Sequence, residues 1–164
     1  MADIDVYLGD NLPILAAMPD GCVSLVYIDP PFNTGKVQQR TQLKTVRDEK
    51  GDRTGFQGKR YRTNKIGTKR YDDTFEDYLA FLEPRLVEAK RILTPNGSLF
   101  FHIDYREAHY CKVLLDQVFG RASFKNEIIW AYDYGARSKK TWSAKHDTIF
   151  WYAKKPDDYV FNYA

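Results

Sequence analysis

Residues Cys22 to Phe32 read Cys-Val-Ser-Leu-Val-Tyr-Ile-Asp-Pro-Pro-Phe. The first seven of these residues form a nearly continuous apolar and β-branched run between turn signals, which is typical of a strand buried on both faces. The run stops at Asp29, because the two prolines that follow fix φ and cannot donate to a sheet ladder. This pattern predicts a central strand that ends in an acidic turn.

The segments around this strand alternate between strand and helix patterns. We expect a strand at 5–8, a helix at 11–18 that Asn11 caps, a helix from Thr74 to 92, a strand at 98–103, a helix from about 106 to 119, and strands at 127–132 and 147–153. This order predicts an α/β sheet with a largely parallel core and an antiparallel terminal pair. The 164 residues, 43% of them hydrophobic, suffice for a single domain, 1–164.

A basic segment interrupts this alternation. The formal net charge is +3, but residues 36–71 hold twelve Lys or Arg and three Asp or Glu, which leaves the rest of the chain acidic. We expect a long, mobile, basic loop there, and loops of that length are usually functional or disordered. It is either a solvated surface or a phosphate-binding segment. For DNA binding, the best candidates are Lys59, Arg60, Arg62, Lys69 and Arg70.

Several classes of protein are excluded by the remaining composition. The two cysteines have no CxxC partner, so we expect neither a disulfide framework nor a cysteine-rich zinc site. No third ligand at metal spacing accompanies His146-Asp147, and we predict no metal. The start has no signal-peptide pattern and no stretch is long and apolar enough to span a membrane, so a cytoplasmic protein is expected.

Carboxylates follow three of the expected strands, at Asp10, Asp29 and Asp104. Ligands bind outside the carboxyl ends of strands in an open α/β sheet. The turn at Asp29 is the most informative, because its carboxylate and the Pro30 carbonyl can accept both hydrogens of one amino group. Pro31 removes a second competing donor, and Phe32 can stack on the ring that bears the amine.

This arrangement suits methylation of a nucleobase amine. The exocyclic amine of adenine or cytosine is a poor nucleophile, because its lone pair is delocalised into the ring. Two hydrogen bonds accepted from the amine favour a pyramidal nitrogen, which frees the lone pair to attack an electrophilic methyl group. The base must leave the duplex to reach the turn, and an aromatic face can hold it there.

Several blocks along the chain resemble one family in the same order. They are Asp10-Asn11-Leu12, residues 18–28, Asp29-Pro30-Pro31-Phe32-Asn33-Thr34-Gly35, residues 74–79, residues 97–104, residues 126–130 and residues 146–149. This succession resembles the amino-group DNA methyltransferases of the β circular-permutation class. The resemblance implies a Rossmann-like fold, S-adenosylmethionine as methyl donor and double-stranded DNA as substrate. Asp rather than Ser before the two prolines is more typical of adenine-N6 than of cytosine-N4 members.

The resemblance also implies roles for particular residues. It places catalysis at Asp29, Pro30, Pro31 and Phe32, with cofactor contacts from Asp10 and Asp29. A helix cap or turn is the alternative for Asp10. His102 and Asp104 either line the cleft or have a structural role.

One block of the family pattern is absent. The cofactor is held in this class by a Phe-x-Gly-x-Gly turn, whereas no two of the ten glycines here are two residues apart. We therefore expect a truncated or split catalytic half, inactive alone, with an incomplete sheet, an exposed edge and a tendency to self-associate. Its partner would be the missing C-terminal half or a second copy. A non-catalytic nucleic-acid-binding module and a methyltransferase for RNA or protein amides are the alternatives.

Overall fold

A computed structural model describes residues 4–51, 53–54, 58–73, 75–134 and 139–163, except for the side chains of 36–43 and 69–72. The chain forms two compact units, Asn33–Phe75 and the remainder.

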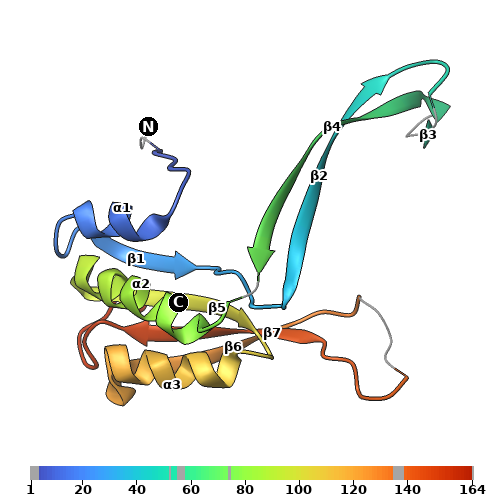
Figure 1. The fold of residues 1–164 in the computed structure, drawn as a ribbon. Coiled ribbons are helices and arrows are strands. Elements are labelled where there is room, and N and C mark those ends of the chain that lie inside the picture. Colours follow the sequence, from blue (N-terminus) through green and yellow to red (C-terminus); the bar gives the residue numbers. More distant parts are fainter. Residues whose placement is uncertain (1–3, 52, 55–57, 74, 135–138, 164) are drawn as a thin grey trace. The chain divides into compact units, whose positions relative to one another are not determined.

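The larger unit is an α/β sheet of four described strands in the order β1-β5-β7-β6. These strands are β1 (Val23–Ile28), β5 (Leu93–Asp104), β6 (Phe124–Ala131) and β7 (His146–Ala153). β1 runs parallel to β5, and β7 runs antiparallel to both of its neighbours, so β1, β5 and β6 point the same way (Figure 1). The predicted α/β sheet with an antiparallel terminal pair is confirmed.

The described residues of this unit form the helices α1 (Asn11–Ala17), α2 (Tyr78–Ile92) and α3 (Ala108–Phe119), with a short 3-10 helix at Arg121–Ser123. α2 buries the stripe of Tyr78, Leu82, Leu86, Ala89 and Ile92. It begins later than expected, since Asp77 caps it by accepting a hydrogen bond from Ala80 N at 2.9 Å; Thr74 lies outside the described residues. None of the described helices is long and apolar enough to cross a membrane.

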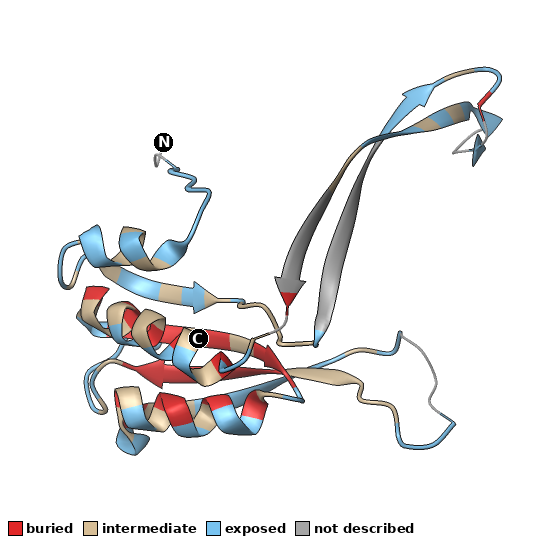
Figure 2. Ribbon diagram, in the orientation of Figure 1, coloured by how far each residue is buried: buried red, intermediate tan, exposed pale blue. Residues whose placement is uncertain are grey.

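The core lies between these helices and one face of the sheet (Figure 2). Leu99 and Phe101 of β5 are fully buried, and their register partners on β7 are Tyr152 and Phe150. Phe101 shares a cavity with side chains of α2, and the Tyr152 hydroxyl donates to Asp116 of α3 at 2.6 Å. Both long helices therefore cover the same face of the sheet.

Two expectations about the first strands are wrong. Residues 5–8 lie outside the sheet and are exposed, because no described strand pairs with them. β1 is not buried on both faces: it lies at the edge of the described sheet, with Leu25 57% and Tyr27 52% exposed. Its apolar run is covered on the helical face alone within the described residues. The expected exposed edge and apolar surface are present.

The smaller unit corrects the expected basic loop. It is an antiparallel ribbon in which β2 (Lys36–Arg47) pairs with β4 (Arg60–Asp73), and β3 (Arg53–Thr54) adds to β4. At its base the buried Asp73 carboxylate accepts hydrogen bonds from Asn33 N at 2.9 Å and Thr34 N at 3.1 Å. These hydrogen bonds hold the first residues of the smaller unit, Asn33 and Thr34, against Asp73 near its last residue.

Candidate active site at the carboxyl ends of β1 and β5

The Asp29–Phe32 turn follows β1 directly, at the edge where ligands bind in α/β sheets. Parallel pairing sets Ile28 opposite Phe101, so the residue after each of them, Asp29 and His102, lies at the same level of the sheet. Asp29 Oδ1 is 3.9 Å from His102 Nδ1, and the Asp29 side chain is 60% exposed. The predicted acidic group is therefore accessible at the expected edge.

Tyr78 fixes the backbone of the turn. Its ring is buried at the start of α2, and its hydroxyl donates a hydrogen bond to the Pro31 carbonyl. The carbonyl of the second proline, Pro31, thus has a structural hydrogen bond. The Pro30 carbonyl is the one that the proposed recognition of an amine would use.

Aromatic rings surround His102 at this edge. The Phe32 ring centroid lies 5.7 Å from the imidazole at a tilt of 59°, and the Trp130 ring lies 6.1 Å away, nearly parallel at 12°. The Tyr27 hydroxyl is 3.1 Å from His102 Nδ1. His102 therefore joins the predicted stacking ring, Phe32, to side chains of β1 and β6.

A second carboxylate completes the cluster around His102. Asp147 Oδ2 of β7 is 3.4 Å from His102 Nε2, and the Tyr132 hydroxyl donates to Asp147 at 3.5 Å. The imidazole thus lies between Asp29 on one side and Asp147 on the other. Desolvation, and then the charge of Asp29, raise the pKa of the Tyr27 hydroxyl.

Asp10 and Asp104, the other two carboxylates expected at strand ends, have structural contacts, and Asp10 follows no described strand. Asp10, and not Asn11, caps α1: its Oδ1 accepts from Leu12 N at 3.1 Å and from Arg85 Nη2 at 2.8 Å. The hydrogen bond from Leu12, followed by the Arg85 guanidinium, holds the Asp10 pKa below its usual value. Asp104 is buried and accepts a hydrogen bond from Arg106 N at 3.0 Å. Only His102 of the pair His102 and Asp104 reaches the turn.

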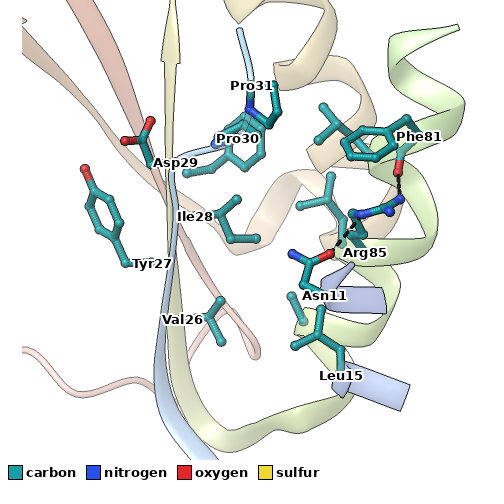
Figure 3. A pocket seen from close by; sticks show the side chains of 14 residues that line it. Asn11, Leu15, Val26, Tyr27, Ile28, Asp29, Pro30, Pro31, Phe81 and Arg85 are labelled. Atoms are coloured by element: carbon teal, nitrogen blue, oxygen red, sulfur yellow. Dashed lines mark hydrogen bonds between the residues drawn. The ribbon is translucent and has the colours of Figure 1, made fainter. Parts of the chain in front are cut away.

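A cavity of about 370 Å³ lies between β1 and the helices α1 and α2 (Figure 3). Apolar side chains dominate its wall, and Pro30 and Pro31 lie at one end of it. The Asp29 carboxylate points away from the cavity, to the same side of β1 as Tyr27. Arg85 enters from α2, where Nε donates to Asn11 Oδ1 at 3.0 Å and Nη1 donates to Phe81 O at 2.6 Å. The cavity thus extends from the two prolines of the turn to Arg85, whose guanidinium also bonds to Asp10.

The candidate DNA-binding residues belong to the ribbon. Lys59, Arg60 and Arg62 are exposed at the start of β4. Lys69 and Arg70 are also in β4, but their side chains lie outside the described set. The described side chains include no group of three or more His, Cys, Asp or Glu that could hold a metal ion.

Residues 23–164 match the model of a protein family described as DNA methylase. The name of this family refers to N6 and N4 methyltransferases. The chain belongs to the DNA methylase family. The resemblance in the sequence blocks is thereby confirmed.

Two curated relatives in the DNA methylase family come from bacteria. The Mod subunit of the type III restriction-modification enzyme EcoP15I of Escherichia coli is 25% identical over 93% of this chain. The type II methyltransferase M.KpnI of Klebsiella pneumoniae is 28% identical, also over 93%. This chain spans only 24% and 35% of their respective lengths.

Solved structures support the same fold. The cytosine-N4-specific PvuII DNA methyltransferase superposes with a TM-score of 0.56 at 16% identity, covering 92% of this chain and 49% of its own. A DNA modification methylase of Thermus thermophilus, solved with S-adenosyl-L-methionine, gives 0.52 at 19% identity and covers 95% and 55%. The Rossmann-like methyltransferase sheet is therefore confirmed.

Proposed function

We propose that this chain supplies the base-binding and catalytic part of an adenine-N6 DNA methyltransferase of a restriction-modification system, acting in the cytoplasm of a bacterium or of a phage-infected cell. The observation that carries the proposal is the Asp29–Phe32 turn itself. Its acidic side chain is exposed, its backbone is held by Tyr78, and its aromatic ring lies beside His102. Membership of the DNA methylase family supports the reaction class.

In this proposal the turn binds the amine of a base that has left the duplex. The Asp29 carboxylate and the Pro30 carbonyl each accept one amine hydrogen, which localises the nitrogen lone pair for attack. Phe32 stacks on the base, as aromatic side chains do with flipped nucleotides. We assign the backbone contact with the amine to the Pro30 carbonyl, because the Pro31 carbonyl already accepts the Tyr78 hydrogen bond.

The proposed methyl donor is S-adenosylmethionine, which supplies an electrophilic methyl group. Both contacts of Asp10 fall on Oδ1, so Oδ2 is the oxygen that remains for the cofactor's adenine. The cavity that Pro30 and Pro31 line extends to Arg85, the partner of Asp10. The glycine turn with which the family holds the cofactor is not present in these 164 residues. In this proposal the side chains of this chain therefore form one side of the cofactor site, and the other side comes from a further segment.

The deciding experiment is methyl transfer from labelled S-adenosylmethionine to duplex DNA, followed by chromatography of the nucleosides. The 164-residue chain is assayed alone and together with the segment of M.KpnI that it does not match. We expect N6-methyladenine in the supplemented reaction only, and loss of the product in Asp29→Ala. Methylation that survives Asp29→Ala would refute the role of the turn, and N4-methylcytosine as product would refute the adenine assignment.

The same assay separates the alternative acceptors. A methyltransferase for an RNA base or a protein amide would need the same pair of acceptors, Asp29 and Pro30. RNA and peptide substrates are therefore offered in parallel with DNA. The expected result is transfer to DNA alone.

Two partners remain proposals. One is the segment that the longer relatives have and this chain does not span. The other is a second copy of this chain, since the β1 edge exposes Leu25 and Tyr27. Sedimentation of the chain with and without the M.KpnI segment distinguishes a hetero-complex from a homo-oligomer.

A further inference from the structure

We propose that the β2–β4 ribbon is a DNA-binding arm that enters the major groove of a B-form duplex. The inference rests on the proposed function for the choice of DNA as the polymer, but it does not depend on catalysis. It concerns the ribbon alone and rests on its charge, its lack of a core and its width.

Cations are exposed on both faces of the ribbon. Cross-strand partners share a face, and Lys44 pairs with Asn64, Val46 with Arg62, and Arg47 with Tyr61. Six Lys or Arg with described side chains lie within β2, β3 and β4. Because side chains alternate along a strand, these six residues divide between the two faces. One face carries Lys44, Arg60 and Arg62, and the other carries Arg47, Arg53 and Lys65.

These cations greatly outnumber the acidic groups near them. Between residues 44 and 54 and between 58 and 68 the described side chains include eight Lys or Arg, all exposed, and two acidic residues, Asp48 and Glu49. Arg62 Nε pairs with Asp48 Oδ2 at 3.0 Å, and that Arg62 side chain is still 53% exposed. A polyanion is the ligand that suits such a surface.

The ribbon has no core of its own within the described residues. Between 44 and 68 the only buried residue described is Gly51, and the apolar Val46 and Ile66 are 39% and 64% exposed. Among the described side chains of residues 44–68, burial therefore does not explain why the chain forms strands. A ligand that contacts the ribbon along its length would.

The dimensions of the ribbon select the groove. Paired strands lie about 4.8 Å apart, and the major groove, about 12 Å wide, admits a two-stranded ribbon. The minor groove, about 6 Å wide, must be widened before it can do so. The twelve residues of β2 span about 40 Å at ~3.3 Å per residue, a little more than one turn of DNA.

Charge on both faces fits insertion better than docking on the outside of a duplex. A ribbon lying on the outside needs cations on one face, whereas an element within a groove has phosphates on both sides. Duplex RNA offers a direct contrast, because the major groove of the A-form is deep and narrow and excludes such an element. The inference therefore predicts a preference for duplex DNA over duplex RNA of the same sequence.

The test is fluorescence anisotropy of a labelled duplex of about 20 bp, roughly two helical turns, with the full 164-residue chain across a series of salt concentrations. We compare Arg60→Gln/Arg62→Gln with the control pair Arg121→Gln/Lys155→Gln, which removes the same charge from exposed positions of the larger unit. The ribbon pair should reduce the slope of log affinity against log salt by about 1.8, at ~0.9 per phosphate contact. The control pair should leave the slope unchanged.

A second ribbon pair, Lys44→Gln/Lys65→Gln, leaves the Arg62–Asp48 ion pair intact and should reduce the slope similarly. Netropsin, which fills the minor groove, should not displace the chain, whereas methyl green, which occupies the major groove, should. No DNA binding by the unmodified chain, equal binding of duplex RNA, displacement by netropsin, or an equal effect of the control pair would each overturn the inference.

The readout keeps this inference separate from the proposed function. DNA binding that depends on the ribbon, without any methyl transfer in the supplemented assay, would contradict the proposed function alone. Methyl transfer and unchanged affinity in the ribbon variants would contradict the present inference alone.

Discussion

Among the single residues that the structure describes, Tyr78 is the one whose hydroxyl bonds to the backbone of the turn. Its ring belongs to the apolar stripe of α2, while its oxygen donates to the Pro31 carbonyl. One side chain thus contributes both to the core and to the geometry of the candidate active site. The two contributions can be separated, because phenylalanine retains the ring and removes only the donor.

We expect Tyr78→Phe to lower the free energy of unfolding by about 1 kcal/mol, the usual net value of one hydrogen bond. Urea denaturation of the full chain measures the change. Tyr110→Phe, which alters a hydroxyl on an exposed ring of α3, is the matched control and should have no effect. Equal midpoints for both variants would show that the bond to Pro31 does not hold the turn.

The residues of the site differ in how far the sequence could predict them. Asp29, Pro30, Pro31 and Phe32 were predictable because turn chemistry is local, although their catalytic role stays a prediction. The contacts of His102 with Phe32 and Trp130 depend on strand register, which a single sequence does not reveal. Trp130 is 57% exposed and stacks on His102.

At the scale of elements, the far end of the ribbon depends on one glycine. Gly51 N donates to Asp48 O at 2.9 Å, and a Cβ at Gly51 would lie 2.2 Å from the Tyr61 carbonyl carbon. A backbone atom cannot move aside as the end of a flexible side chain can. The connection from β2 to β3 therefore requires glycine at this position.

Gly51→Ala should weaken the end of the ribbon, lowering the local opening free energy by about 1–3 kcal/mol, as overpacking typically does. Amide hydrogen exchange of residues 53, 54 and 60–62 reports the change. Gly67→Ala is the matched control, since a Cβ there meets nothing within 4 Å. Similar exchange in the two variants would contradict the close packing of Gly51 on β4.

The ribbon itself was missed for a physical reason. Alternation of apolar and polar residues reveals a strand only when one face is buried, and neither face of this ribbon has an apolar covering in the described part. A segment with many charged residues and no apolar alternation is typical of a loop, which is why a loop was expected here. The helices α1, α2 and α3 were predictable because each carries end signals, and α2 and α3 bury an apolar stripe.

At the scale of the whole molecule, the burial is concentrated in the larger unit. Leu99, Phe101, Leu115 and Tyr152 are fully buried there, on β5, α3 and β7. Cys111 of α3 lies in the same core, and burial, followed by the charges of Glu107 and Asp104, raises the pKa of its thiol to about 12. Cys22, which precedes β1, is exposed.

Iodoacetamide at about pH 8, near the ordinary thiol pKa, should therefore modify Cys22 alone in the folded chain, and both thiols in urea. Because the folded state holds the Cys111 proton more tightly than the unfolded chain, its contribution to stability is full below about pH 9 and is lost as the pH rises towards about 12. Mass spectrometry locates the label, and urea titrations on either side of the unfolded-state pKa follow the stability. Labelling of Cys111 at the rate of Cys22 would mean that the core is open.

The hydrogen bonds between Asp73 and the backbone of Asn33 and Thr34 affect which changes of length this chain can accept during evolution. Lys36 pairs with Asp73 across the ribbon, and Asn33 N and Thr34 N bond to the Asp73 carboxylate, so the two ends of the unit are held together by its own contacts. An insertion whose ends already meet adds little loop-closure entropy to its host. The arm can therefore lengthen, shorten or be exchanged for another between Phe32 and Glu76 while the sheet that carries Asp29 is conserved.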